Sequence, residues 1–168
     1  MVKKILVTML FVLSLTVGVA SAAVSGGGTP VPSITYGGDD GTTCRAIWYG
    51  TPGNDYFPGT TVPDCEYGGS GADTLNGGAG TDVLFGNDGN DSFSGASESD
   101  TIYGGLGFDT ASAGNENDVI YFDDGQSDGT VDCGAGNDQV WLDTNDRAGT
   151  PNCEQVILQI DPRYYHNF

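Results

Sequence analysis

The sequence predicts an all-β chain whose short strands stack into a solenoid, and three regularities predict it. Residues 50–121 divide into eight consecutive segments of nine residues without an insertion. The sixth place of all eight segments is aspartate, and the eighth place is apolar in seven of them. One apolar side chain between glycine-rich turns describes a very short strand, which can bury that side chain only when neighbouring segments stack on it.

The two regular places define two columns of side chains. A disordered glycine-rich linker is the alternative interpretation of so much glycine, but the apolar column argues against it. The sixth-place residues are Asp55, Asp64, Asp73, Asp82, Asp91, Asp100, Asp109 and Asp118. The eighth-place residues are Phe57, Glu66, Leu75, Leu84, Phe93, Ile102, Ala111 and Ile120.

The first 22 residues are typical of a bacterial export signal. Lys3 and Lys4 precede an apolar run that reaches about Ala20, and the sequence Ala-Ser-Ala at residues 20–22 offers a signal-peptidase site. A retained anchor helix is the alternative, although the run is shorter than the ~20 residues that a membrane span prefers. Residues 23–40 predict a linker because they contain Gly, Pro and Ser without periodicity. We therefore expect a product that is secreted or lies at the cell surface, without a membrane span in the mature chain.

The net charge of this chain limits the classes of partner that it can bind. Its 168 residues, which suggest one domain, include 23 acidic and only 5 basic residues, so its formal charge is −18. Nucleic acid is excluded because phosphate binding needs a cluster of Lys and Arg. Cations are the expected partners, and an extracellular or surface partner is left open.

The nonapeptide pattern weakens on both sides, which is typical of terminal repeats. Residues 41–49 place Trp48 inward but Ala46 where aspartate is expected, and residues 133–141 restore the pattern with Asp138. Between them, a two-residue insertion at positions 122–123 precedes the segment 124–132, whose sixth place is glycine. The β-solenoid is thus predicted over 41–142, and residues 143–168 are predicted to form a C-terminal cap and tail, in which the apolar stretch 153–160 could cover the open end.

Four cysteines are too widely spaced for a CxxC metal site, and an oxidising compartment favours disulfides. Three pairings are possible. We favour Cys44 with Cys65 and Cys133 with Cys153, because these enclose loops of similar length at the two ends of the repeat region. Each disulfide would stabilise the fold by roughly 3 kcal/mol.

Segment by segment, residues 50–141 match G-G-x-G-x-D-x-U-x, in which U is apolar, and so resemble the haemolysin-type calcium-binding repeats of RTX proteins. The endings DCGAGND and NCE are also similar to exported, disulfide-containing bacterial members. The resemblance implies a parallel β-roll with two nonapeptides per coil and several calcium ions between successive turns on each edge. The implied ligands are the sixth-place aspartates with Asp138, and the turn residues Gly53, Gly69, Gly71, Gly78, Gly80, Gly89, Gly105 and Gly107.

The residues themselves suit calcium. Glycine permits the sharp turns that point carbonyl oxygens together, and an aspartate two residues after the last glycine adds a charged oxygen. Calcium takes six to eight such oxygens in irregular geometry, whereas magnesium keeps its waters and zinc prefers His or Cys ligands. The only histidine is His166. Calcium also relieves the repulsion among stacked aspartates, so folding is expected to depend on calcium.

Alternate segments share an edge of the roll, so the two edges can be compared. On the first edge the fourth place is glycine throughout: Gly53, Gly71, Gly89 and Gly107. On the second edge it is Val62, Gly80, Glu98 and Glu116. A side chain in a left-handed turn costs on the order of 1 kcal/mol. We expect about three good calcium sites on the first edge and weaker or fewer sites on the second, unless the two glutamates contribute oxygens.

No group of residues predicts catalysis, so we expect a non-enzymatic, calcium-dependent repeat protein. One alternative is an accessory module of an extracellular enzyme. Another is an adhesive or carbohydrate-binding solenoid stabilised by calcium. Its surface would be lined by the aromatic residues Tyr103, Tyr121, Trp141, Tyr164 and Tyr165.

Overall fold

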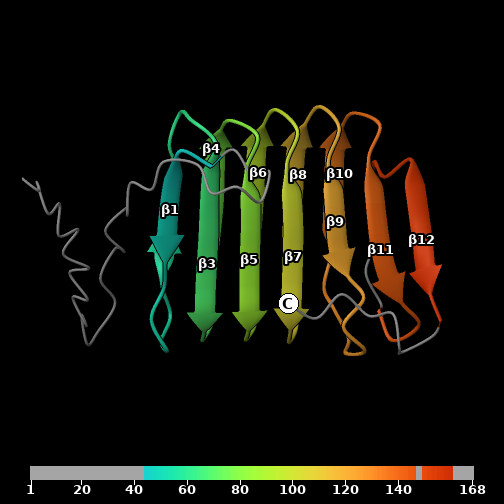
Figure 1. Ribbon diagram of the computed structural model, residues 1–168. Helices are drawn as coiled ribbons and strands as arrows, with labels where there is room; N and C mark the ends of the chain where they lie inside the picture. Colours follow the sequence, from blue (N-terminus) through green and yellow to red (C-terminus); the bar gives the residue numbers. More distant parts are fainter. Residues whose placement is uncertain (1–43, 147–148, 161–168) are drawn as a thin grey trace, which may run out of the picture.

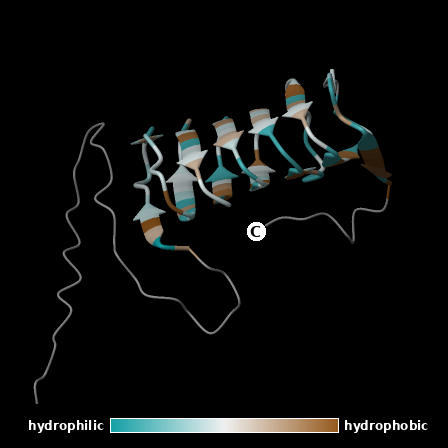
Figure 2. Ribbon diagram, turned by 90° about the horizontal axis from the view of Figure 1, so that it is seen from above, coloured by the Kyte–Doolittle hydropathy of each residue, from teal (hydrophilic) through white to brown (hydrophobic). Residues whose placement is uncertain are grey.

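The computed structural model describes residues 44–146 and 149–160, which form twelve β-strands and no helix. The strands lie in two sheets that face each other as two layers (Figures 1 and 2). These ranges contain no helix that is long and apolar enough to cross a membrane. The expected export signal, the linker and residues 161–168 lie outside the described residues.

Every pair of neighbouring strands is parallel, and the chain passes from one sheet to the other at each step from β1 to β11. The seven-stranded sheet contains, in order, β1 (Ala46–Tyr49), β3 (Asp64–Ser70), β5 (Val83–Asp88), β7 (Thr101–Leu106), β9 (Val119–Phe122), β11 (Gln139–Asp143) and β12 (Gln155–Gln159). The five-stranded sheet contains β2 (Tyr56–Phe57), β4 (Thr74–Ala79), β6 (Ser92–Ser97), β8 (Thr110–Asn115) and β10 (Val131–Ala135). The all-β parallel β-roll is confirmed.

The register follows from the nine-residue period. Two segments make one coil, so Leu84 on β5 pairs with Glu66 on β3 and with Ile102 on β7. Equal places therefore lie above one another through the whole stack. A slip of one residue would turn the apolar side chain of a strand outward, so the eighth place fixes the register.

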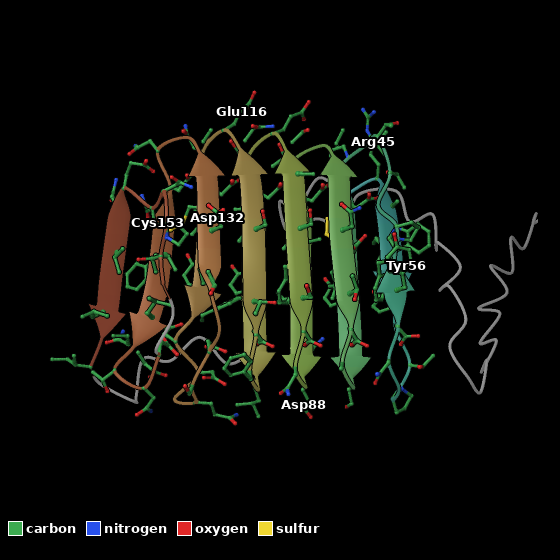
Figure 3. The ribbon with its side chains drawn as sticks, turned by 180° about the vertical axis from the view of Figure 1, so that it is seen from behind. Arg45, Tyr56, Asp88, Glu116, Asp132 and Cys153 are labelled. Atoms are coloured by element: carbon green, nitrogen blue, oxygen red, sulfur yellow. A yellow bond between two sulfur atoms is a disulfide. The ribbon has the colours of Figure 1, made fainter. Side chains whose placement is uncertain are left out.

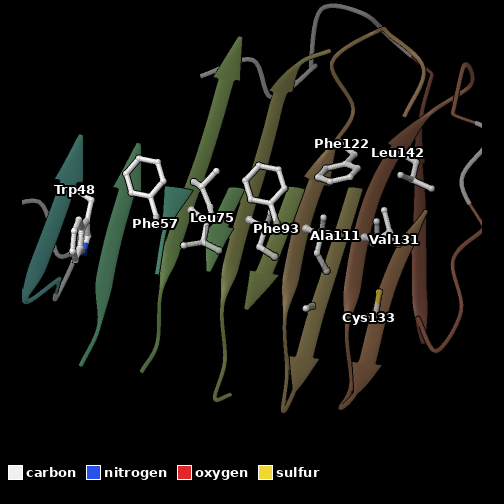
Figure 4. Close-up of a cluster of buried hydrophobic side chains, with 14 of the residues drawn as sticks. Trp48, Phe57, Leu75, Phe93, Ala111, Phe122, Val131, Cys133 and Leu142 are labelled. Atoms are coloured by element: carbon white, nitrogen blue, oxygen red, sulfur yellow. The ribbon is translucent and has the colours of Figure 1, made fainter. Parts of the chain in front are cut away.

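The eighth-place side chains meet between the two sheets and form the hydrophobic core (Figure 4). Phe57, Leu75, Leu84, Ile102 and Ile120 are all fully buried. The core continues through the flanking coils with Trp48, Val131, Val140 and Leu142. No single coil contributes more than a few of these side chains, so the stability of each coil depends on its neighbours.

Glu66 is the one acidic residue in this column. It is fully buried between Trp48 and Leu84, and neither of its carboxyl oxygens has a hydrogen-bond partner. Burial raises the pKa of Glu66 to about 9, and the nearby Asp64 and Asp82 add to this effect. The side chain is therefore a neutral acid at pH 7.

The insertion that the sequence places at residues 122–123 lies elsewhere. Phe122 is the last residue of β9, is 1% exposed and pairs with Leu142. Compared with the regular spacing, one extra residue precedes Asp128 and another separates it from Val131, the partner of Ala111. The expectation that this segment lacks a sixth-place aspartate is wrong, because Asp128 occupies that place and accepts a hydrogen bond from the Asp109 N–H at 2.8 Å.

Two disulfides close the ends of the roll in the favoured pairing. Cys44 is bonded to Cys65 with a Cα–Cα distance of 5.5 Å, and Cys133 to Cys153 with a Cα–Cα distance of 5.0 Å. The apolar stretch near the C-terminus forms β12 and pairs with β11. It lacks a facing strand in the second sheet, so Leu158 remains 61% exposed.

Candidate metal centre

The turns lie at two edges of the roll, at opposite ends of the strands. First-edge turns lead from the seven-stranded to the five-stranded sheet, and second-edge turns lead back. Figure 3 labels Asp88 in a first-edge turn and Glu116 in a second-edge turn. The sixth place of each segment lies where a turn ends and the next strand begins, so aspartate side chains from successive coils gather at each edge.

These carboxylates form two continuous files. In each file, one aspartate oxygen, Oδ1, accepts a hydrogen bond from the backbone N–H of the sixth-place residue one coil earlier, at 2.7–2.8 Å through the regular coils. The first-edge file contains Asp55, Asp73, Asp91, Asp109, Asp128 and Asp146. The second-edge file contains Asp64, Asp82, Asp100, Asp118, Asp138 and Glu154.

The other oxygen of the interior aspartates has no partner. It is buried, and no hydrogen bond reaches it. The aspartates with such an unpaired Oδ2 are Asp73, Asp91, Asp109 and Asp128 on the first edge and Asp82, Asp100, Asp118 and Asp138 on the second. A buried polar atom without a partner indicates a missing ligand such as water or an ion.

Burial raises the pKa of these carboxyl groups, and neighbouring carboxylates raise it further. The pKa is about 6 for Asp73 and Asp91, about 7 for Asp82, Asp109 and Asp118, and about 8 for Asp100. Burial also raises the pKa of Asp128 and Asp138. The hydrogen bonds from backbone N–H groups favour the ionised forms but do not cancel the cost of burial.

An unpaired aspartate oxygen and a backbone carbonyl oxygen both lie beside the first-place glycine in several coils. A Cβ atom added to Gly68 would lie 2.5 Å from Asp73 Oδ2 and 2.8 Å from the carbonyl oxygen of Gly86. Gly86 and Gly95 are surrounded in the same way by the Oδ2 of their own segment and the first-place carbonyl of the next coil. A side chain at the first place would collide with both oxygens, so glycine leaves the space beside them open.

Turn backbones at the second and fourth places are left-handed. Seven of the eight glycines predicted as site residues have φ between +90° and +147°, namely Gly69, Gly71, Gly78, Gly80, Gly89, Gly105 and Gly107. Gly53 is the exception. Glu98 and Glu116 adopt the same turn with φ of 73° and 75°, so the second edge keeps the fold at a backbone cost of about 1 kcal/mol for each glutamate. Both edges carry four unpaired oxygens, and the expected difference in calcium occupancy stays a prediction.

The donor set fits calcium. Among the described residues, no three His, Cys, Asp or Glu side chains converge on one point, so a metal ion here must also use backbone carbonyls. All four cysteines are in disulfides. What remains are carboxylate and carbonyl oxygens, which calcium accepts in large numbers and irregular arrangements.

Comparison with known proteins gives the same assignment. Residues 67–102 and 94–127 match the family model described as the RTX calcium-binding nonapeptide repeat. Residues 67–127 therefore contain RTX-type calcium-binding repeats. No curated protein and no solved structure matches the chain. Beyond the matched residues, the parallel coils continue to β1 and β12 by strand pairing.

All nine predicted aspartates lie in the two files of the RTX repeats, and sequence reasoning missed three further members. Asp128 was missed because the extra residues lie on either side of it and not at residues 122–123. Asp146 lies 18 residues after Asp128, so the regular spacing could have found it. Glu154 accepts the hydrogen bond of the Asp138 N–H at 3.0 Å, but its spacing of 16 residues gives no such signal.

Proposed function

We propose that this RTX repeat protein folds around calcium outside the cell and has no catalytic activity of its own. The observation that carries the proposal is the pair of carboxylate files with eight buried, unpaired oxygens. Ionised carboxylates at these positions repel one another and lack water, which opposes folding of the metal-free chain at neutral pH. Calcium, when bound, supplies the positive charge that offsets both costs.

The expected contribution of calcium is large enough to control folding. At about 1 mM calcium and a Kd of about 0.1 mM, each site would add roughly 1.4 kcal/mol to the free energy of unfolding. Several such sites equal a large part of the ~5–15 kcal/mol by which domains are stable. Export is supported by the two disulfides, which persist in oxidising compartments.

The test is far-ultraviolet circular dichroism of the disulfide-bonded chain in chelator and in millimolar calcium. We expect a weak, largely unfolded spectrum in chelator and a β spectrum in calcium, with magnesium at the same concentration much less effective. A β spectrum of equal intensity in chelator and in calcium at pH 7.5 would contradict calcium-coupled folding.

The carbohydrate-binding alternative gains no support from the aromatic residues. Tyr49, Tyr67, Phe85, Tyr103 and Tyr121 stack along the outer face of the seven-stranded sheet, with ring centroids 4.8–5.1 Å apart and nearly parallel planes. Trp141 continues the stack at 6.0 Å. Sugar rings bind the faces of aromatic rings, but within this column the faces of the rings are covered by the neighbouring rings. The column therefore contributes cross-strand packing rather than a platform for a glycan.

A further inference from the structure

The first aspartate of each file differs from the interior ones, because its Oδ2 already accepts a hydrogen bond. Oδ2 of Asp55 accepts hydrogen bonds from the backbone N–H of Thr51 at 2.5 Å and from the Thr51 hydroxyl at 3.0 Å. Asp64 receives the equivalent pair from Thr60, with the N–H at 2.8 Å from Oδ2 and the hydroxyl at 3.1 Å from Oδ1. Neither aspartate has a buried oxygen without a partner.

Threonine at the second place explains the difference. In the six interior segments this place has a left-handed backbone, with φ between 72° and 118° at Gly69, Gly78, Asn87, Ala96, Gly105 and Gly114. Thr51 and Thr60 do not have a positive φ, and a β-branched residue strongly disfavours one. The two threonine turns therefore take another conformation, in which both the N–H and the hydroxyl point at the aspartate that would otherwise face a metal ion.

We propose that Thr51 and Thr60 close the N-terminal ends of the two calcium files, so that Asp55 and Asp64 are hydrogen-bonded end caps and calcium binding begins at Asp73 and Asp82. The far end of the first-edge file is closed in a similar way. There Asp146 accepts the Asp128 N–H at 3.1 Å and the Asp143 N–H at 2.7 Å. This inference rests on the proposed calcium binding and specifies which repeats provide it.

The consequence is a terminal coil whose sixth-place aspartates are hydrogen-bonded without metal. The same coil contains the disulfide between Cys44 and Cys65. A coil that is closed by hydrogen bonds and a covalent link does not depend on calcium for its local structure. It offers the second coil a formed edge on which to stack, and this contact makes the folding of a repeat array favourable.

The experiment counts bound calcium per chain by equilibrium dialysis and calorimetry, using the disulfide-bonded full chain. Asp55→Asn and Asp64→Asn are expected to leave the number of ions unchanged. The matched interior variants Asp73→Asn and Asp82→Asn should each lose about one ion. A loss in Asp55→Asn or Asp64→Asn equal to that in the matched interior variant would overturn the inference and leave the proposed function intact. An absence of calcium binding in the unmodified chain would overturn both.

A second experiment looks for a gain of calcium binding. It remains informative even when the asparagine variants fail to fold. Thr51→Gly turns residues 50–55 into G-G-P-G-N-D, which fits the repeat motif, and removes the hydroxyl donor. We expect one additional ion in Thr51→Gly and none in the control Thr51→Ser, which keeps the hydroxyl. An unchanged ion count in Thr51→Gly would count against the closing role of threonine.

Discussion

At the scale of the residue, the sixth and eighth places of each segment both point inward, but one carries a carboxylate and the other an apolar side chain. The eighth place favours apolar side chains because it points into the core, and the sixth place brings a carboxylate into the same low-polarity interior. Oδ1 is held by a backbone N–H, which leaves Oδ2 for a cation. Glu66 breaks this division, since it places a carboxyl group in the apolar column, where burial raises its pKa more than the nearby Asn76 N–H lowers it.

We therefore predict that Glu66→Leu stabilises the protein. The change removes a buried polar group without a partner, which costs about 1–3 kcal/mol, and adds apolar contact with Trp48 and Leu84. The free energy of unfolding should rise by at least about 1 kcal/mol in urea at pH 7 and fixed calcium. Glu66→Gln is the control and should remain close to the unmodified protein, because a neutral amide replaces a neutral acid. A less stable Glu66→Leu variant would show that the carboxyl group has a stabilising partner.

At the scale of the element, strands and register could be predicted from the sequence because eight uninterrupted segments fix every place. The insertion near residue 122 could not be located. Its extra residues lie in a turn that ends in Asp128, and neither glycine nor serine there marks which residue is additional. The hydrogen bonds from Thr51 to Asp55 could not be predicted from the sequence either. The motif specifies the residue types, but it does not specify the conformation of a turn in which threonine replaces glycine.

The turn at Gly68 allows a direct test of the first place. We predict that Gly68→Ala lowers calcium affinity, because its methyl group would enter the space between Asp73 Oδ2 and the Gly86 carbonyl oxygen. We expect at least a tenfold rise in the Kd of about one site, together with a lower midpoint of thermal unfolding in calcium. The control is Gly149→Ala, since an added Cβ there meets no atom within 4 Å. Equal calcium titrations of the two variants would remove Gly68 from the metal centre.

At the scale of the whole molecule, the roll behaves as a stack of mutually dependent coils with a strongly acidic interior at both edges. Each file links successive coils in two ways. A backbone N–H of one coil donates a hydrogen bond to Oδ1 of the next, and a proton or a calcium ion beside Oδ2 offsets its negative charge. Protons and calcium ions compete for this second oxygen, because either one removes the unbalanced negative charge. The stability of the protein should therefore depend strongly on pH without calcium and only weakly with it.

We predict that the metal-free protein becomes less stable as pH rises. The interior aspartates have folded-state pKa values of about 6 to 8, above the ordinary value of 3.8 that they take when unfolded. A raised folded pKa stabilises the fold fully below the unfolded value, and this contribution is lost as pH rises through the folded value. While one such group titrates, the loss is about 1.4 kcal/mol per pH unit, so unfolding in calcium-stripped buffer should occur at a much lower temperature at pH 8 than at pH 5.

Saturating calcium should largely abolish this trend between pH 5 and pH 8, because calcium-bound carboxylates carry no protons and the unfolded aspartates, with an ordinary pKa of 3.8, are already ionised in this range. Thermal melts at both pH values, with and without calcium, measure the two slopes. Calorimetry in two buffers of different ionisation enthalpy counts the protons that calcium displaces, and at a pH at which the metal-free chain is folded we expect at least one per chain. Equal slopes in the two series would mean that the ions bind away from the two files, because calcium held by these carboxylates must compete with their protons.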